Sequence, residues 1–406
     1  MKQTKMVYLP YLCFFALLLF GCNAQADLAV EKQRFELDNF VTFGGETIKK
    51  VAVGWESYGQ LNSKKDNVIL VTHFFTGNSH AAGKYSPEDQ QAGYWDAIIG
   101  PGKAIDTQRY FVISVDSLAN LGVHDPHVIT TGPASIDPDT GKPYGLSFPV
   151  VTIRDFVNIQ KAVLESLGIT KLHGVIGASM GSLQAIDWAA TYPDWVPRMI
   201  SVVGSGQADA WLTAALERWS IPIKLDPNWQ QGNYYQGKAP LAGLTAALMF
   251  ITQDALTPAF FNSIGQSETM NFSPLEEAPL HDINQSHSIV RWLKSRAAAR
   301  AELMDANHLL YLVRANQLFL AGHGSDLRSG LKNIQAKSLF LPAENDLLLM
   351  PYLANDAHQI LRSLGKDSQL ETLSGPGGHL EGVVGVAQKA EKIAAFLANK
   401  EIEDEK

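Results

Sequence analysis

Ser179 is the residue whose surroundings most clearly suggest chemistry. It lies in Gly177-Ala178-Ser179-Met180-Gly181, a G-x-S-x-G pattern between the apolar run KLHGVI and the helical segment SLQAIDWAATYP. Such a serine stands on a tight strand-to-helix turn, where a side chain at either glycine would collide with neighbouring backbone. Ser179 would act there as a nucleophile, and the backbone N–H of Met180 would face the oxyanion that develops during attack on an acyl group. A glycine-rich turn with an inert serine is the simpler alternative.

An acid and a base follow Ser179 in the chain order that this arrangement requires. Asp346 ends the run KSLFLPAEND, and His379 follows SQLETLSGPGG. We expect His379 to accept the proton of Ser179 and to return it to the leaving group. Asp346 would bind the other imidazole nitrogen and stabilise its charged form. Alone, Asp346 could be a helix cap and His379 a loop residue, but with Ser179 they predict a catalytic triad.

A second oxyanion donor is expected in the segment VTHFFTGNSH, which follows an apolar strand. In this architecture the loop after the third strand supplies that donor. Phe75 is the candidate, because the chain turns sharply just after it. His73 and His80 flank the turn, and we expect them to be structural hydrogen-bonding residues.

The segments around these residues predict an α/β fold with a mostly parallel sheet and helices on both faces. Apolar runs alternate with segments of helical periodicity, which implies parallel strands joined by right-handed crossovers. One helix is expected to begin at Thr152 and stop at Gly168, and the helix after Ser179 to end before Pro193. The expected strands are NVILVTHF, RYFVISVD, KLHGVI, RMISVVGSG and KSLFLPAEND, preceded by an antiparallel pair that turns at Gly44-Gly45.

The pattern divides the chain into a core and an insertion. Residues 27–206 and 325–400 carry the alternating strands and helices, whereas 207–324 read as helices and loops without a clear strand. We therefore expect 207–324 to form a helical lid over the sheet. The acidic end, 401–406, reads as a solvated tail.

Residues 1–26 read as an export leader. Lys2 and Lys5 precede the run MVYLPYLCFFALLLFG, which is too short and too terminal for a spanning helix. The sequence LLFGC resembles a lipobox, in which Cys22 would become a lipidated first residue that attaches the protein to a membrane. Cleavage after Ala24-Gln25-Ala26 and an uncleaved membrane-proximal anchor are the alternatives. A periplasmic or lipoprotein location is expected.

Composition narrows the choice of partners and cofactors. The chain is 46% hydrophobic and 18% charged, as expected for a soluble enzyme, and its net charge of -8 without a Lys/Arg cluster argues against a nucleic-acid partner. Both cysteines, Cys13 and Cys22, lie in the leader, which excludes disulfides and a cysteine nucleophile from the mature protein. His124 and His127 lack a third ligand at a suitable spacing. We predict no metal and no cofactor.

Longer motifs connect these features to one family. YWDAIIGPGKAIDTQRYFVI, TTGPASIDPDTGKPYGLSFPVVTIRD, HFFTGNSHAAG, GASMGSLQAIDWA and MDANHLLYL resemble the signatures of the homoserine O-acetyltransferases, a branch of the α/β hydrolases, over nearly all of the mature sequence. The resemblance implies an α/β-hydrolase fold, a Ser179–His379–Asp346 triad and ping-pong acyl transfer through an acyl-serine. It also implies a homodimer built through the lid.

Two positions depart from that family. The residue after the catalytic histidine is usually an aspartate that holds the substrate's amino group, and here it is Leu380. The first long lid helix usually carries an arginine for the substrate carboxylate, and the matching stretch GLTAALMFITQ, which contains Leu248, has none. A charged amino acid without such partners would be costly to bind in an apolar pocket. Leu380 and Leu248 are therefore the candidate pocket residues.

Three functions follow from these observations. The first is an exported serine hydrolase or acyltransferase that acts on an uncharged or apolar small-molecule acyl ester and does not use homoserine. This reading is favoured because acetyl-CoA is cytosolic, so an exported enzyme would lack that donor. The second is a homoserine O-acetyltransferase of methionine biosynthesis that uses acetyl-CoA. The third is a non-catalytic envelope binding protein on a hydrolase scaffold.

Overall fold

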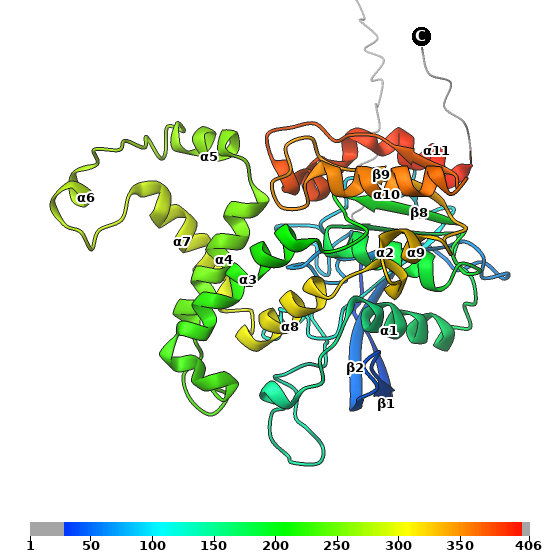
Figure 1. Ribbon diagram of the computed structural model, residues 1–406, viewed down its shortest axis with the longest axis horizontal. Helices are drawn as coiled ribbons and strands as arrows, with labels where there is room; N and C mark the ends of the chain where they lie inside the picture. The colour runs from blue at the N-terminus through cyan, green and yellow to red at the C-terminus, as the bar shows by residue number, and fades with distance from the viewer. Residues whose placement is uncertain (1–27, 400–406) are drawn as a thin grey trace, which may run out of the picture.

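The computed structural model describes residues 28–399 (Figure 1). The expected leader, with Cys22, and the expected acidic tail lie outside this range. One eight-stranded sheet runs through the molecule in the order β1-β2-β6-β3-β7-β8-β9-β10. Its strands are β1 (Gln33–Val41), β2 (Thr47–Tyr58), β3 (Val68–Thr72), β6 (Phe111–Val115), β7 (Gly174–Ala178), β8 (Arg198–Val202), β9 (Lys337–Leu341) and β10 (Ser368–Leu370).

The predicted mostly parallel sheet is confirmed. Neighbouring strands from β6 to β10 pair in parallel, whereas β1 pairs antiparallel with β2 and β2 with β6. A separate parallel pair joins β4 (Ile99–Gly100) and β5 (Ile105–Asp106). The central strands VILVT, FVISV and GVIGA are buried along their whole length, as expected for strands covered by helices on both faces.

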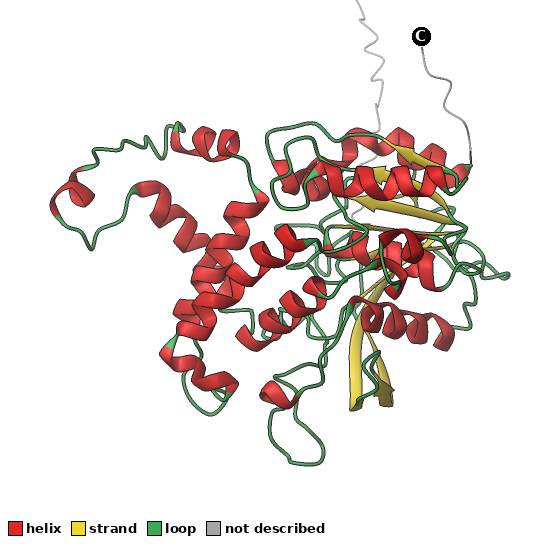
Figure 2. Ribbon diagram, in the orientation of Figure 1, coloured by secondary structure: helices red, strands yellow, loops and turns green. Residues whose placement is uncertain are grey.

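Helices cover both faces of this sheet (Figure 2). Alternate side chains of β3 belong to different layers, because Leu70 joins one hydrophobic cluster and Val71 the other. The first cluster includes residues of α1 (Ile153–Ser166), α2 (Met180–Thr191) and α10 (Pro351–Ser363), and the second includes residues of α11 (Ala390–Ala398). α1 follows Thr152, whose backbone N–H donates to Asp155 Oδ2 at 2.7 Å, and α2 ends before Pro193.

The chain between β8 and β9 forms a mainly helical segment that lies to one side of the sheet (Figure 1). An isolated bridge between Gln207 and Leu320 joins the two ends of this segment. α3 packs on α4 and α8, and α4 packs on α7. The helices of this segment are α3 (Ala210–Leu225), α4 (Leu241–Ala255), α5 (Pro258–Gly265), α6 (Glu277–His281), α7 (Ser288–Ala301) and α8 (Ala306–Gln317). The short α9 (Leu327–Leu331) follows them and packs on α10.

Within residues 28–399, no single helix is long and apolar enough to cross a membrane. α4 and α5 reach that length and apolarity only when taken together, and the chain bends by 108° between them.

Candidate active site

Ser179 occupies a strained turn between β7 and α2. Its backbone angles are φ 56° and ψ -124°, a conformation that non-glycine residues rarely adopt. A Cβ on Gly177 would lie 2.1 Å from Thr72 Oγ1, and one on Gly181 would lie 2.0 Å from the Thr72 carbonyl oxygen. Both glycines are therefore required by the close approach of β3, which is the reason given for them from the sequence.

The structure brings Ser179, His379 and Asp346 together from three separate segments. Ser179 Oγ lies 2.8 Å from His379 Nε2, and His379 Nδ1 lies 2.6 Å from Asp346 Oδ2. Because the carboxylate accepts a hydrogen bond from Nδ1–H, the neutral ring carries its proton on Nδ1 and Nε2 presents its lone pair to the serine hydroxyl. Ser179 is 9% exposed, His379 8% and Asp346 2%. A serine at the edge of solvent, an imidazole that can accept its proton and a buried acid that orients the imidazole form the triad that acyl transfer needs.

Backbone and side-chain contacts hold the acid and the base in place. Asp346 Oδ1 accepts the backbone N–H groups of Leu348 and Leu349, at 2.8 and 2.9 Å, so its other oxygen is aimed at the imidazole. Glu381 turns away from the cavity and its Oε1 accepts the Gly377 N–H at 2.9 Å. Glu381 is therefore a support for the loop that carries His379 rather than a partner for a substrate.

Phe75 lines the same cavity as Ser179, and Met180 follows Ser179 directly in the chain. The backbone N–H groups of Phe75 and Met180 donate to no other of residues 28–399. Met180 is the first residue of α2, where the N–H groups have no intrahelical acceptor. The Phe74 carbonyl accepts hydrogen bonds from His73 Nδ1 at 2.8 Å and from the Gly77 N–H at 3.0 Å. Since the peptide bond is planar and trans, fixing that carbonyl also fixes the direction of the Phe75 N–H.

His73 is wholly buried, and its neutral ring hydrogen-bonds this loop to the backbone of Ser117. Its Nε2 accepts the Ser117 backbone N–H at 3.0 Å, so the proton must reside on Nδ1, where it reaches Phe74. Burial lowers the pKa of His73, which keeps the ring uncharged near neutral pH. His73 is thus the structural hydrogen-bonding residue expected from the sequence.

His80 belongs to a buried ionic cluster around Glu56. Glu56 accepts from Lys32 Nζ at 2.7 Å, from His80 Nδ1 at 3.0 Å and from Tyr85 Oη at 2.6 Å. Burial tends to raise the pKa of this carboxyl, but the bonds to His80 and Lys32 outweigh burial and lower the pKa to about 2. Since this cluster lies under the segment 79–85, it anchors the C-terminal end of the loop 73–80, which contains Phe75 and is called the oxyanion loop below.

His124 and His127 contact separate parts of the structure. The backbone N–H of His124 donates to the Leu303 carbonyl at 3.1 Å, and the His127 ring stacks on Tyr85 with centroids 3.9 Å apart. In the part of the chain that the structure describes, no three histidine, aspartate, glutamate or cysteine side chains are grouped as a metal would need.

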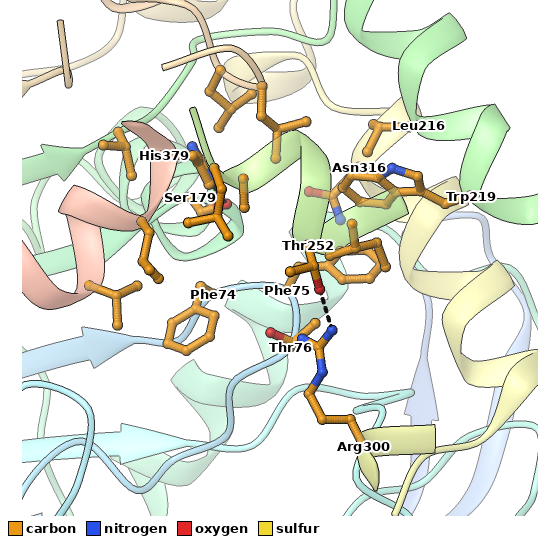
Figure 3. A pocket seen from close by; sticks show the side chains of 18 of the residues that line it. Phe74, Phe75, Thr76, Ser179, Leu216, Trp219, Thr252, Arg300, Asn316 and His379 are labelled. Carbon is orange, nitrogen blue, oxygen red and sulfur yellow. Dashed lines mark hydrogen bonds between the residues drawn. The ribbon is translucent and has the colours of Figure 1, made fainter. Parts of the chain in front are cut away.

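A cavity of about 510 Å³ opens from the triad toward the lid (Figure 3). Leu380 lines this cavity beside His379, as predicted, but the prediction for Leu248 is wrong. The side chain of Leu248 is fully buried in the hydrophobic core, because α4 turns that face toward its neighbouring helices. Most of the lining is apolar and includes Phe74, Leu183, Leu212, Leu216, Trp219, Ile251, Phe260 and Val383.

The stretch GLTAALMFITQ lies in α4 and carries no arginine, as its sequence states, but another lid helix brings arginines to the pocket. Arg296 and Arg300 of α7 line the cavity. With Trp292 they repeat every four residues, a spacing that places all three on one helical face. That periodicity was visible in the sequence. What it could not reveal is that this face of α7 turns toward the triad rather than toward solvent.

Comparisons with known proteins agree with this fold. A family described as alpha/beta hydrolase fold matches residues 68–380. A homoserine O-acetyltransferase of Methanococcoides burtonii is 35% identical, over 89% of this chain and 72% of its own. The crystal structure of esterase E22 is 66% identical with a TM-score of 0.89, over 91% of this chain and 100% of that one. The homoserine O-acetyltransferase from Bacillus anthracis is 36% identical with a TM-score of 0.87, over 92% and 98%.

Proposed function

The chain belongs to the homoserine O-acetyltransferase family of the α/β hydrolases, and we propose that it is an exported serine esterase that passes acyl groups from Ser179 to water. It is an enzyme of the acyltransferase and esterase class. The observation that carries the choice of esterase is Leu380, an uncharged side chain at the cavity wall next to His379. The similarity to an esterase at 66% identity supports the same choice.

The geometry supports a two-step reaction. Ser179 Oγ attacks the ester carbonyl carbon while His379 Nε2 accepts the hydroxyl proton, and the new oxyanion faces the N–H groups of Phe75 and Met180. The bond from the carbonyl carbon to the alkoxy oxygen then breaks, and His379 delivers the proton to the departing alcohol. Water next attacks the acyl-serine, His379 takes its proton, and Ser179 leaves with that proton as the acid is released.

Leu380 decides which nucleophile completes the reaction. An amino-acid acceptor would bring an ammonium group beside His379, where Leu380 and the apolar lining offer it no carboxylate. Leaving such a charge unpaired in a partly desolvated cavity costs several kcal/mol. Water carries no such penalty, so hydrolysis is the expected end of the acyl transfer.

Acetyl transfer to homoserine is the second candidate function. It is favoured by the relatives of that name, at about a third identity over most of this chain, and by the two arginines in the cavity. A carboxylate could therefore be accommodated, although the amino group would still lack its partner.

One assay separates the two functions. Protein lacking residues 1–26 is compared with its Ser179→Ala variant, and thiol release from acetyl-CoA is followed with and without L-homoserine beside hydrolysis of para-nitrophenyl acetate. We expect Ser179-dependent ester hydrolysis and no homoserine-dependent thiol release. Thiol release that requires homoserine would replace the esterase proposal with the biosynthetic one.

Export and dimer formation are further parts of the proposal. Export is supported by the leader motif, and recovery of the full-length chain in the cytosolic fraction would contradict it.

A homodimer through the lid is supported by three exposed apolar side chains, Leu275, Leu280 and Ile283, which are 75%, 60% and 96% exposed. Sedimentation at micromolar concentration would contradict the dimer if only monomer were found.

A further inference from the structure

Arg300 is tied to α4 through one end of its guanidinium only. Its Nη2 donates to the Leu248 carbonyl at 3.1 Å and to Thr252 Oγ1 (Figure 3). Nε and Nη1 donate to no other residue in the described range 28–399. The group is therefore held in one orientation by two contacts, while its remaining donors are available to the cavity.

The cavity also lacks a negative charge to balance this cation. Arg296 and Arg300 are among its lining residues and no aspartate or glutamate is, and neither arginine forms an ion pair within residues 28–399. Arg296 instead lies over the Trp292 ring, 5.2 Å from its centroid. Burial lowers the pKa of Arg300, and the nearby Arg296 adds to that effect. A desolvated guanidinium without a carboxylate is costly unless an anion joins it.

We propose that Arg300 binds a carboxylate of the ester substrate while Ser179 attacks the ester group in the same cavity. A planar guanidinium with free donors suits a planar carboxylate, and the single oriented arginine matches a single charge. The proposal rests on the esterase function and narrows it to esters with a free carboxylate, which departs from the uncharged substrate expected from the sequence. Such substrates include half-esters of dicarboxylic acids.

The test compares charged and neutral esters that are otherwise matched. Mono-para-nitrophenyl glutarate is paired with para-nitrophenyl hexanoate, which places the carboxylate on the acyl side. Para-acetoxybenzoate is paired with its methyl ester, which places the carboxylate on the alcohol side. For each pair, kcat/KM is measured with the full-length chain, with Arg300→Gln and with Arg300→Lys. Arg291→Gln is the control, because Arg291 lies on the same helix and does not line the cavity.

We expect Arg300→Gln to lower kcat/KM for the carboxylate ester of at least one pair by about tenfold or more, as for loss of a hydrogen bond to a charged group. For the neutral ester of that pair, kcat/KM of Arg300→Gln should stay within about threefold of the wild-type value. Arg300→Lys should recover part of the loss seen with the carboxylate ester. Equal losses for charged and neutral esters, or no change in either pair, would overturn the proposal. If Ser179-dependent hydrolysis of the neutral esters persisted in that case, only the carboxylate site would fail and the esterase function would stand.

Discussion

Leu380 is the side chain that we propose separates this active site from one built for an amino acid. The residue follows His379 directly and lines the cavity, so any charge placed there would stand close to the imidazole and to the bound acyl group. A leucine at this point leaves the imidazole free of a second carboxylate and gives the substrate an apolar contact. Neither effect requires a change in the triad, so on this proposal one side chain beside an unchanged nucleophile redirects the acyl transfer.

Substituting Leu380 tests the proposed role of this side chain in substrate preference. Leu380→Asp should lower kcat/KM for para-nitrophenyl acetate by about tenfold, because a carboxylate in a largely apolar cavity costs binding energy. It should also raise acyl transfer to L-homoserine relative to hydrolysis. The matched control is Leu380→Asn, which has a similar shape without the charge. Equal behaviour of the two variants would show that the charge is not what matters at this position.

The oxyanion loop follows β3 in the chain and lies beside the N-terminus of α2. His73 holds the Phe74 carbonyl, and the close approach of Gly177 and Gly181 to Thr72 keeps the loop beside Ser179. Both donors therefore depend on backbone placement rather than on a side chain. Small displacements of such a loop are expected to reduce the rate more than the binding of substrate.

His73→Leu tests the role of this loop. The substitution removes the bond to Phe74 and leaves the Ser117 N–H without its acceptor, so kcat should fall by about a hundredfold while KM changes little. Steady-state kinetics on a neutral ester give the split, and thermal unfolding shows how much protein is folded. His173→Leu is the control, because His173 precedes β7 at the end of the strand away from Ser179, and its ring bonds to the Leu397 carbonyl. A loss of stability without a loss of kcat in the folded protein would contradict this role.

The sequence was sufficient for the parts of the site that obey chain order and steric rules. The G-x-S-x-G turn, the acid and base after their strands and the parallel sheet follow from patterns local to each segment. The placement of Leu248 and Arg300 was not predictable in this way, because both depend on how α4 and α7 pack. A helical period shows that Trp292, Arg296 and Arg300 share a face, but only tertiary packing determines what that face meets.

Across the whole molecule, the ionic cluster around Glu56 connects β2 with the residue that precedes β1 and with the segment 80–85. Lys32, His80 and Tyr85 reach the same carboxylate from different parts of the chain, and Glu56 is fully buried. A carboxylate whose pKa is lowered by folding stabilises the folded state above its unfolded pKa. That contribution is lost as the pH falls through the folded pKa.

Acid unfolding measures the contribution of this cluster. The pKa of Glu56 falls from 4.5 to about 2, which at about 1.4 kcal/mol per unit amounts to about 3 kcal/mol. This stabilisation should be present above pH 4.5 and disappear as the pH approaches 2. Urea unfolding over a pH series should show a smaller acid loss for Glu56→Gln than for the wild type, although the variant is less stable at pH 7. The exposed Glu36→Gln is the control, and identical pH slopes for Glu56→Gln and wild type would contradict the account.

Labelling with a fluorophosphonate tests whether Ser179 is the nucleophile that forms a covalent acyl intermediate. The protein is incubated with the reagent beside Ser179→Ala and His379→Ala variants, and the product is examined by intact mass and by peptide mapping. We expect one adduct, on Ser179, with little or no labelling in either variant. No adduct, or an adduct on another serine, would contradict the nucleophile that the strained turn and the 2.8 Å contact with His379 assign.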